Sequence, residues 1–412
     1  MASSSTEVSK STYTESHKTQ YSFAEFPDDL KDEMVIALDG LCFEAIQQSV
    51  TLRPMRILNC NAADSNSGKA FSKAYCEVEM ESNKVFLLGD IFRSGLDILF
   101  DFLENKKNPG SRQEQFVLSK LLSYINSGDD EMCLPTKDLE QLSETELTIM
   151  LANHLYGKLA TSSRYLIDKN CSGKKKNCCS CGRNECKLTG MFGDTSVGNG
   201  QVWHGSLDII INNELVVEPV EEKTESPGGK SPVEVKTKST SLSKNPQIIA
   251  ETVVFSFLQK QTHPERTNFL TPCIAVGSSE MLVMFYDAEH DVLLESSKIP
   301  LFEFVEEMPK KVNLVAILVS WLVVNYKYLC SGLTEEMIDS YKAELFSHIK
   351  DKKDIYENKL VLGNVGISVS SKEKSRKRET IVRSKYLFKK HQKLSRMLFK
   401  EKTDSSAESS DE

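Results

Sequence analysis

The sequence predicts an α/β fold, with a mixed sheet covered by helices. Three observations predict it: apolar residues recur at helical spacing early in the chain, the period becomes that of strands after residue 200, and helices and strands then alternate. The chain has 412 residues, 40% of them hydrophobic and 27% charged, which is enough for more than one globular unit. A wholly disordered chain is excluded.

The first third of the chain is predicted to be mostly helical. Residues 1–20 are polar and predicted to be disordered, whereas residues 21–134 contain the apolar repeats of IFRSGLDILFDFL and QFVLSKLLSYI. A further helix, ETELTIMLANHLYGKLA, should begin after Ser143, because Glu146 follows it at the spacing of a capping box. A Cys-, Lys- and Gly-rich loop is expected from there to about residue 200.

Strands should follow. VWHGSLDIIINN and ELVVEPVEE flank a predicted turn at Asn212 and Asn213, and VEVKT should be a third strand. The next helix has Asn245 as its predicted N-cap and Pro246 in its first turn. Two more strands, LTPCIAVGSS and EMLVMFYD, precede an apolar helix at 312–330, which is too short to cross a bilayer and is predicted to be a buried core helix.

These elements suggest five regions. They are the tail 1–20, the helical region 21–134, the α/β domain 135–330 with a Cys-rich insertion at 171–200, a helical or linker segment 331–371, and a basic segment with an acidic end at 372–412.

The cysteine content indicates a reducing compartment. The chain has 11 cysteines, too few for a disulfide scaffold, and opens with polar, Ser/Thr-rich sequence rather than an apolar leader. We therefore expect a nuclear or cytoplasmic protein that is not secreted and does not insert into a membrane.

Charge is concentrated near the C-terminal end. Residues 372–402 hold thirteen Lys and Arg against three Glu, interleaved with aromatic residues, in a chain whose formal net charge is −8. Such a segment is typical of contact with nucleic acid or with a nuclear import receptor. It could equally be a solvated basic helix.

Three polar residues in the predicted strands could form a metal site. Asp208 lies in an apolar run, where a buried carboxylate needs a positive partner, and Glu234 and Lys236 should share one face of their strand. If the two strands pair, both acids could bind Mg²⁺ or Mn²⁺ while Lys236 positions or deprotonates an attacking water. The alternative is a structural ion pair, since an E-x-K pattern often occurs by chance.

The order of these motifs resembles the PD-(D/E)XK nuclease superfamily, in particular its RecB-like and lambda-exonuclease-like branch. The likeness spans about residues 143–290 and includes G-x-x-D at 205–208 and E-x-K at 234–236; the proline that names the superfamily is replaced by Leu207. It implies a restriction-endonuclease-like fold, with Asp208 and Glu234 as metal ligands and Lys236 as the catalytic lysine.

The resemblance also assigns roles to flanking residues. Gln247 matches a helical Gln that steadies the site, but Glu251 stands where the branch often has Tyr. Glu144 or Glu146 could supply an upstream metal-binding carboxylate, although Glu146 is equally explained by the capping box. His204 should share a face with Asp208 and could contact substrate, or it could be a packed, hydrogen-bonded residue.

The Cys-rich loop is a second candidate metal site. Its cysteines are Cys171, Cys178, Cys179, Cys181 and Cys186, and Cys171, Cys178, Cys181 and Cys186 could enclose Zn²⁺. The C-x-x-C at 178–181 has no second C-x-x-C to pair with it, so a flexible reduced loop is the alternative.

The leading hypothesis is a metal-dependent nuclease acting on nucleic acid, with DNA preferred over RNA as the expected substrate. The alternatives are a catalytically inactive nuclease-like fold that binds nucleic acid, and a protein-interaction module with a basic targeting tail.

Overall fold

A large mixed sheet, covered by helices on both faces, forms the centre of the protein. The computed structural model describes residues 28–44, 49–64, 67–81, 84–127, 142–171, 179, 181, 183, 186–212, 214–219, 242–303 and 311–365. Residues 1–364 form one compact unit and residues 365–412 another, of which only Val365 is described. The α/β class that the sequence predicts is confirmed.

The main sheet has 11 strands among the described residues, in the order β2-β1-β12-β11-β10-β9-β8-β4-β5, with β3 beside β1 and β13 beside β11. Pairs β4–β5 and β9–β10 are parallel, and the remaining pairs are antiparallel. The strands are β1 (Thr51–Cys60), β2 (Cys76–Met80), β3 (Phe86–Leu87), β4 (Tyr165–Asp168), β5 (Met191–Gly193), β8 (Ile209–Ile211), β9 (Leu215–Pro219), β10 (Leu270–Val276), β11 (Glu280–Asp287), β12 (Val292–Ser296) and β13 (Ile299–Pro300).

A smaller sheet of three strands is formed by β14 (Val361–Leu362), β6 (Ser196–Gly198) and β7 (His204–Ser206). The sequence predicts one strand through VWHGSLDIIINN, and this prediction is wrong. β7 pairs with β6, and β8 pairs with β4 and β9 in the main sheet. Leu207 and Asp208 connect the two sheets, so Asp208 lies in a break of the strand rather than inside it.

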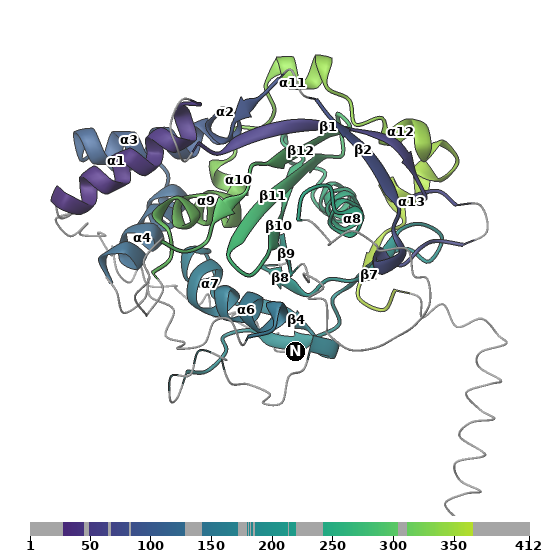
Figure 1. Ribbon diagram of the computed structural model, residues 1–412, viewed down its shortest axis with the longest axis horizontal. Helices are drawn as coiled ribbons and strands as arrows, with labels where there is room; N and C mark the ends of the chain where they lie inside the picture. The colour runs from purple at the N-terminus through teal and green to yellow at the C-terminus, as the bar shows by residue number, and fades with distance from the viewer. Residues whose placement is uncertain are drawn as a thin grey trace, which may run out of the picture. The chain divides into compact units, whose positions relative to one another are not determined.

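The helices pack on the two faces of the main sheet. They are α1 (Asp28–Cys42), η1 (Phe71–Lys73), α2 (Leu88–Ile91), α3 (Arg93–Asn105), α4 (Arg112–Asn126), α6 (Glu144–Leu151), η3 (Ala152–Tyr156), α7 (Gly157–Leu159), η4 (Lys169–Cys171), α8 (Pro246–Thr262), α9 (Leu314–Val324), α10 (Tyr326–Leu329), α11 (Glu335–Ser340), α12 (Leu345–His348), η5 (Lys350–Lys352) and α13 (Lys353–Asn358). Figure 1 shows α8 on one face, with α9 and α7 on the other.

Strand alternation divides the interior into two cores. Ile209 and Ile211 of β8 pack with residues of α4, α6 and α9, whereas Ile210 between them packs with residues of α8. Alternate side chains of β10 and β11 likewise pack into one core or the other, as expected for strands covered on both faces. Helix α8 joins the parallel pair β9–β10 and packs mainly against β10 and β11.

Region 21–134 is less helical than the sequence predicts. It contributes β1, β2 and β3 to the main sheet besides α1 to α4. β1 carries Pro54 and an irregular burial pattern, and it pairs with β12 more than 200 residues later in the chain. No local period therefore marks it as a strand.

The apolar helix predicted at 312–330 is confirmed as a core element. α9 is buried along almost its full length, and the Trp321 indole nitrogen donates to the Val117 carbonyl of α4. Among the described residues, no helix is long and apolar enough to span a membrane.

The N-cap of α8 is as the sequence predicts. The Asn245 side chain accepts from the Gln247 backbone N–H at 2.9 Å, and Pro246 occupies the first turn. We expect Asn245→Ala to lower the free energy of unfolding by about 1 kcal/mol, because the Gln247 N–H loses its acceptor. Asn245→Asp should keep most of the parental stability, because its carboxylate can accept the same hydrogen bond. Urea denaturation of both variants checks this, and equal stability of Asn245→Ala and the parent would contradict it.

Candidate functional site

A buried carboxylate on α8 is the centre of the candidate site. Glu251 is 0% exposed, although it is ionisable. Gln247, one turn earlier, donates its amide to Glu251 Oε1 at 2.9 Å. Glu251 Oε2 is also buried and, within the described part of the chain, has no hydrogen-bond partner. An unsatisfied buried oxygen costs roughly 1–3 kcal/mol and therefore indicates a missing partner such as a cation or a donor.

Asp208 is the second acid of the site. Burial raises the pKa of Glu251 well above its usual value; the Gln247 hydrogen bond opposes this rise, and the negative charge of Asp208 adds to it. Asp208 is partly buried at the break before β8, and its backbone carbonyl accepts from the Asp168 N–H at 2.9 Å. The sheet and α8 thus bring two like charges near each other, as in many cation sites.

The strand pairing that the sequence predicts beside Asp208 falls on residues that the structure does not describe. β8 has β4 on one side and β9 on the other, paired through Ile209↔Val217. Segment VEVKT, with Glu234 and Lys236, lies outside the described residues, so its predicted pairing and the predicted roles of both side chains stay predictions.

The other predicted carboxylate has a structural task. Ser143 and Glu146 form the capping box of α6: the Ser143 N–H donates to Glu146 Oε2 at 3.0 Å, and the Glu146 N–H donates to Ser143 Oγ at 3.3 Å. The capping explanation is confirmed, and the catalytic assignment of Glu146 remains a prediction. The backbone of Glu144 begins α6, and its side chain lies outside the described set.

His204 does not share a strand with Asp208. It belongs to β7 in the smaller sheet, and its Nδ1 lies 2.8 Å from the Val202 carbonyl oxygen. The face-sharing argument is wrong because the strand breaks at Leu207. The alternative, a packed and hydrogen-bonded histidine, agrees with this contact.

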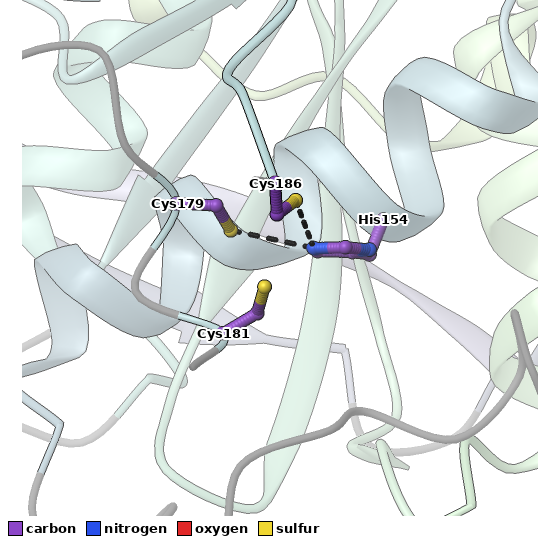
Figure 2. A group of neighbouring side chains, drawn as sticks. All are labelled: His154, Cys179, Cys181 and Cys186. Atoms are coloured by element: carbon purple, nitrogen blue, oxygen red, sulfur yellow. Dashed lines mark hydrogen bonds between the residues drawn. The ribbon is translucent and has the colours of Figure 1, made fainter. Parts of the chain in front are cut away.

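The set of cysteine ligands that the sequence predicts is partly wrong. Cys181 and Cys186 do come together, but their companions are Cys179 and His154 (Figure 2), with all four ligand atoms within 4.8 Å of one another. Cys171 instead places its thiol 3.5 Å from Asp208 Oδ1. Cys178 lies outside the described residues. His154 was missed because it precedes Cys179 by 25 residues and sits in an apolar helix, so no local spacing connects them.

Burial raises the pKa of the Cys179 and Cys186 thiols. The Arg183 side chain opposes this rise at Cys186, which places a positive charge beside the cluster. Among the described residues, the His/Cys cluster could hold a metal and is a ligand set of the kind that suits Zn²⁺. The carboxyl oxygens of Asp208 and Glu251 are of the ligand type that Mg²⁺ and Mn²⁺ prefer.

Comparison with known proteins identifies no relative. No family model, no curated protein and no solved structure matches the chain.

Proposed function

We propose that the protein is a divalent-cation-dependent nuclease with Asp208 and Glu251 in its metal site. The buried, unpartnered Oε2 of Glu251 carries the proposal, because it lies near a second carboxylate in a space of low dielectric constant. Two acids so placed repel each other unless a proton or a cation lies between them. Carboxylate oxygens are also the ligands that Mg²⁺ and Mn²⁺ prefer.

The order of elements supports the same proposal. Helix α6, the antiparallel strands β4, β8 and β9, helix α8 and the parallel strand β10 come in this order in the chain, with β5, β6 and β7 between β4 and β8. The four strands are neighbours in the main sheet. The resemblance to PD-(D/E)XK nucleases implies an acid on one strand, a second acid on the next, and a Gln on the helix that follows. Asp208, Glu234 with Lys236, and Gln247 stand in this order in the chain, with Glu234 and Lys236 between β9 and α8.

Each side chain would have one task. Asp208 and Glu251 would bind the cation, and Gln247 would hold Glu251 in place. Lys236 would position the attacking water or accept its proton. A bound Mg²⁺ or Mn²⁺ would supply a water of lowered pKa and offset the charge that builds on the phosphate.

The proposed substrate is nucleic acid, with DNA preferred over RNA. The support is the basic segment 372–402, whose cations and interleaved aromatic residues suit a phosphate backbone and exposed bases. This segment lies outside the described residues. An import receptor is the other partner proposed for it, together with a nuclear location.

A catalytically silent nucleic-acid-binding protein with this fold is the second candidate. The Gln247–Glu251 hydrogen bond favours it, because a Glu251 kept neutral by burial can remain in the core as an ordinary hydrogen-bonding partner. Such a protein would bind nucleic acid without cutting it.

Cleavage and binding assays on the full chain separate the two candidates. We expect Mg²⁺ or Mn²⁺ to support cleavage of labelled DNA, and a chain ending at residue 371 to bind DNA more weakly and with a shallower salt dependence. RNA of the same sequence serves as the comparison substrate. Salt-sensitive binding with no cleavage under either cation would favour the silent protein, and no binding would oppose both.

A further inference from the structure

One histidine and three cysteines from two separate parts of the chain lie together in the fold. His154 lies in the π-helical turn η3, which interrupts the helix between α6 and α7. Cys179, Cys181 and Cys186 come from the loop between η4 and β5. Figure 2 shows the imidazole and the three thiols directed toward one point. Turns of π-helix occur frequently at functional sites.

The spacing of the ligand atoms agrees with a tetrahedral metal. His154 Nε2 lies 3.3 Å from Cys179 Sγ and 3.5 Å from Cys186 Sγ. Zinc bond lengths near 2.3 Å to sulfur and 2.0–2.1 Å to nitrogen require sulfur–nitrogen edges of about 3.6 Å in a tetrahedron. A metal could thus enter with shifts of only a few tenths of an ångström at these two contacts.

The surroundings hold the cluster in a defined orientation. Asn153, beside His154, donates its amide to Cys186 Sγ at 3.5 Å, and its carbonyl oxygen accepts from the Tyr165 hydroxyl at 3.0 Å. The Cys179 N–H also donates to the Cys186 carbonyl at 3.2 Å, which closes the loop on itself. Hydrogen bonds to ligating sulfurs and between ligand segments are typical of metal sites.

We propose that His154, Cys179, Cys181 and Cys186 form a closed, structural zinc site. Three thiolates with one imidazole are a common structural zinc set, whereas iron–sulfur clusters take four cysteines or two histidines with two cysteines. Four protein ligands leave no position for substrate, so the site is not catalytic. Arg183 offsets the net negative charge of a zinc ion bound by three thiolates.

The zinc site has a mechanical role. The described loop residues 179, 181, 183 and 186 belong to no helix or strand, so the metal would add strong connections to the few hydrogen bonds that hold them. It joins the loop to η3, and through Asn153 and Tyr165 to the start of β4. β4 is the strand beside β8, which Asp208 precedes. This inference does not depend on nuclease activity.

Metal analysis of the purified full chain tests the proposal. We expect about one zinc per chain and no stoichiometric iron. Cys181→Ser should lose most of the zinc, because Cys181 is fully buried in the cluster. Cys171→Ser should keep it, because Cys171 contacts Asp208 instead. Zinc kept in Cys181→Ser, lost in Cys171→Ser, or replaced by iron would overturn the assignment.

A second variant and a second probe cover the case in which Cys181→Ser fails to fold. Cys186 is only partly buried, and Cys186→His replaces its thiolate with another zinc ligand. We expect this variant to bind Co²⁺ tetrahedrally, with weaker sulfur-to-cobalt charge-transfer absorption than the parent. The parent should show the absorption of three thiolates. No tetrahedral Co²⁺ spectrum in the parent would overturn the proposal, whatever the cleavage assay gives.

Discussion

Asp208→Asn is expected to reduce the rate of cleavage by on the order of a thousandfold or more, because charge-stabilising groups in active sites commonly contribute this much. Asparagine has nearly the volume of aspartate and leaves the backbone hydrogen bond from Asp168 to residue 208 intact. The loss should therefore be one of metal binding and not of folding. A single-turnover assay with Mg²⁺ and with Mn²⁺ measures the effect.

The matched control is Asp354→Asn. Asp354 is an exposed residue of helix α13, is paired with Lys359 and Asn358, and has no proposed catalytic role. Its replacement should leave the cleavage rate within about twofold of the parent, because exposed ion pairs contribute little. Circular dichroism would show that both variants are folded. Cleavage by Asp208→Asn at the parental rate would rule out the proposed site.

Glu251→Gln is expected to have opposite effects on cleavage and on stability. Cleavage should fall by on the order of a hundredfold or more, since an amide binds Mg²⁺ poorly. Stability without added divalent cation should rise by about 1–3 kcal/mol, because glutamine keeps the oxygen that accepts from Gln247 and removes a buried carboxylate that lies near a second acid. Functional sites commonly carry such a stability cost.

Glu295→Gln provides the contrast for the stability measurement. Glu295 is almost as buried as Glu251, but its two oxygens accept from Ser243 Oγ at 2.6 Å and from the Lys244 N–H at 2.7 Å. Its replacement removes the negative charge that strengthens both hydrogen bonds and obliges the Ser243 hydroxyl to turn and accept from the new amide, so stability should fall by about 1 kcal/mol. Urea denaturation in divalent-free buffer measures both. If Glu251→Gln lowered the free energy of unfolding as much as Glu295→Gln does, burying the Glu251 carboxylate would carry no cost in stability.

Helices with local start signals were predictable from the sequence, and elements fixed by distant pairing were not. Ser143 and Asn245 mark the starts of α6 and α8 through their own hydrogen bonds to the next turn. The continuous apolar runs of β10 and β11 also identify buried strands. β1 depends on pairing with β12, and the break at Leu207 depends on two separate sheets, so neither has a local signal.

The candidate site was predictable to a similar degree. Asp208 and Gln247 were found by their order in the chain, and the helical spacing of Gln247 and Glu251 placed them on one face. The sequence alone leaves the role of Glu251 open. Its burial, which makes it the centre of the candidate site, depends on how α8 packs against the sheet. The proposed zinc ligands needed the same three-dimensional information, because His154 and Cys179 approach only after folding.

Calorimetric titration of the zinc-loaded full chain with Mn²⁺ tests the central claim most directly, because it measures cation binding without requiring substrate. A site shared by Asp208 and Glu251 predicts saturable binding of Mn²⁺ to the parent, which is lost in Asp208→Asn and in Glu251→Gln but kept in Asp354→Asn. Mn²⁺ binding of equal affinity in the parent and in both site variants, or no binding to the parent, would contradict it.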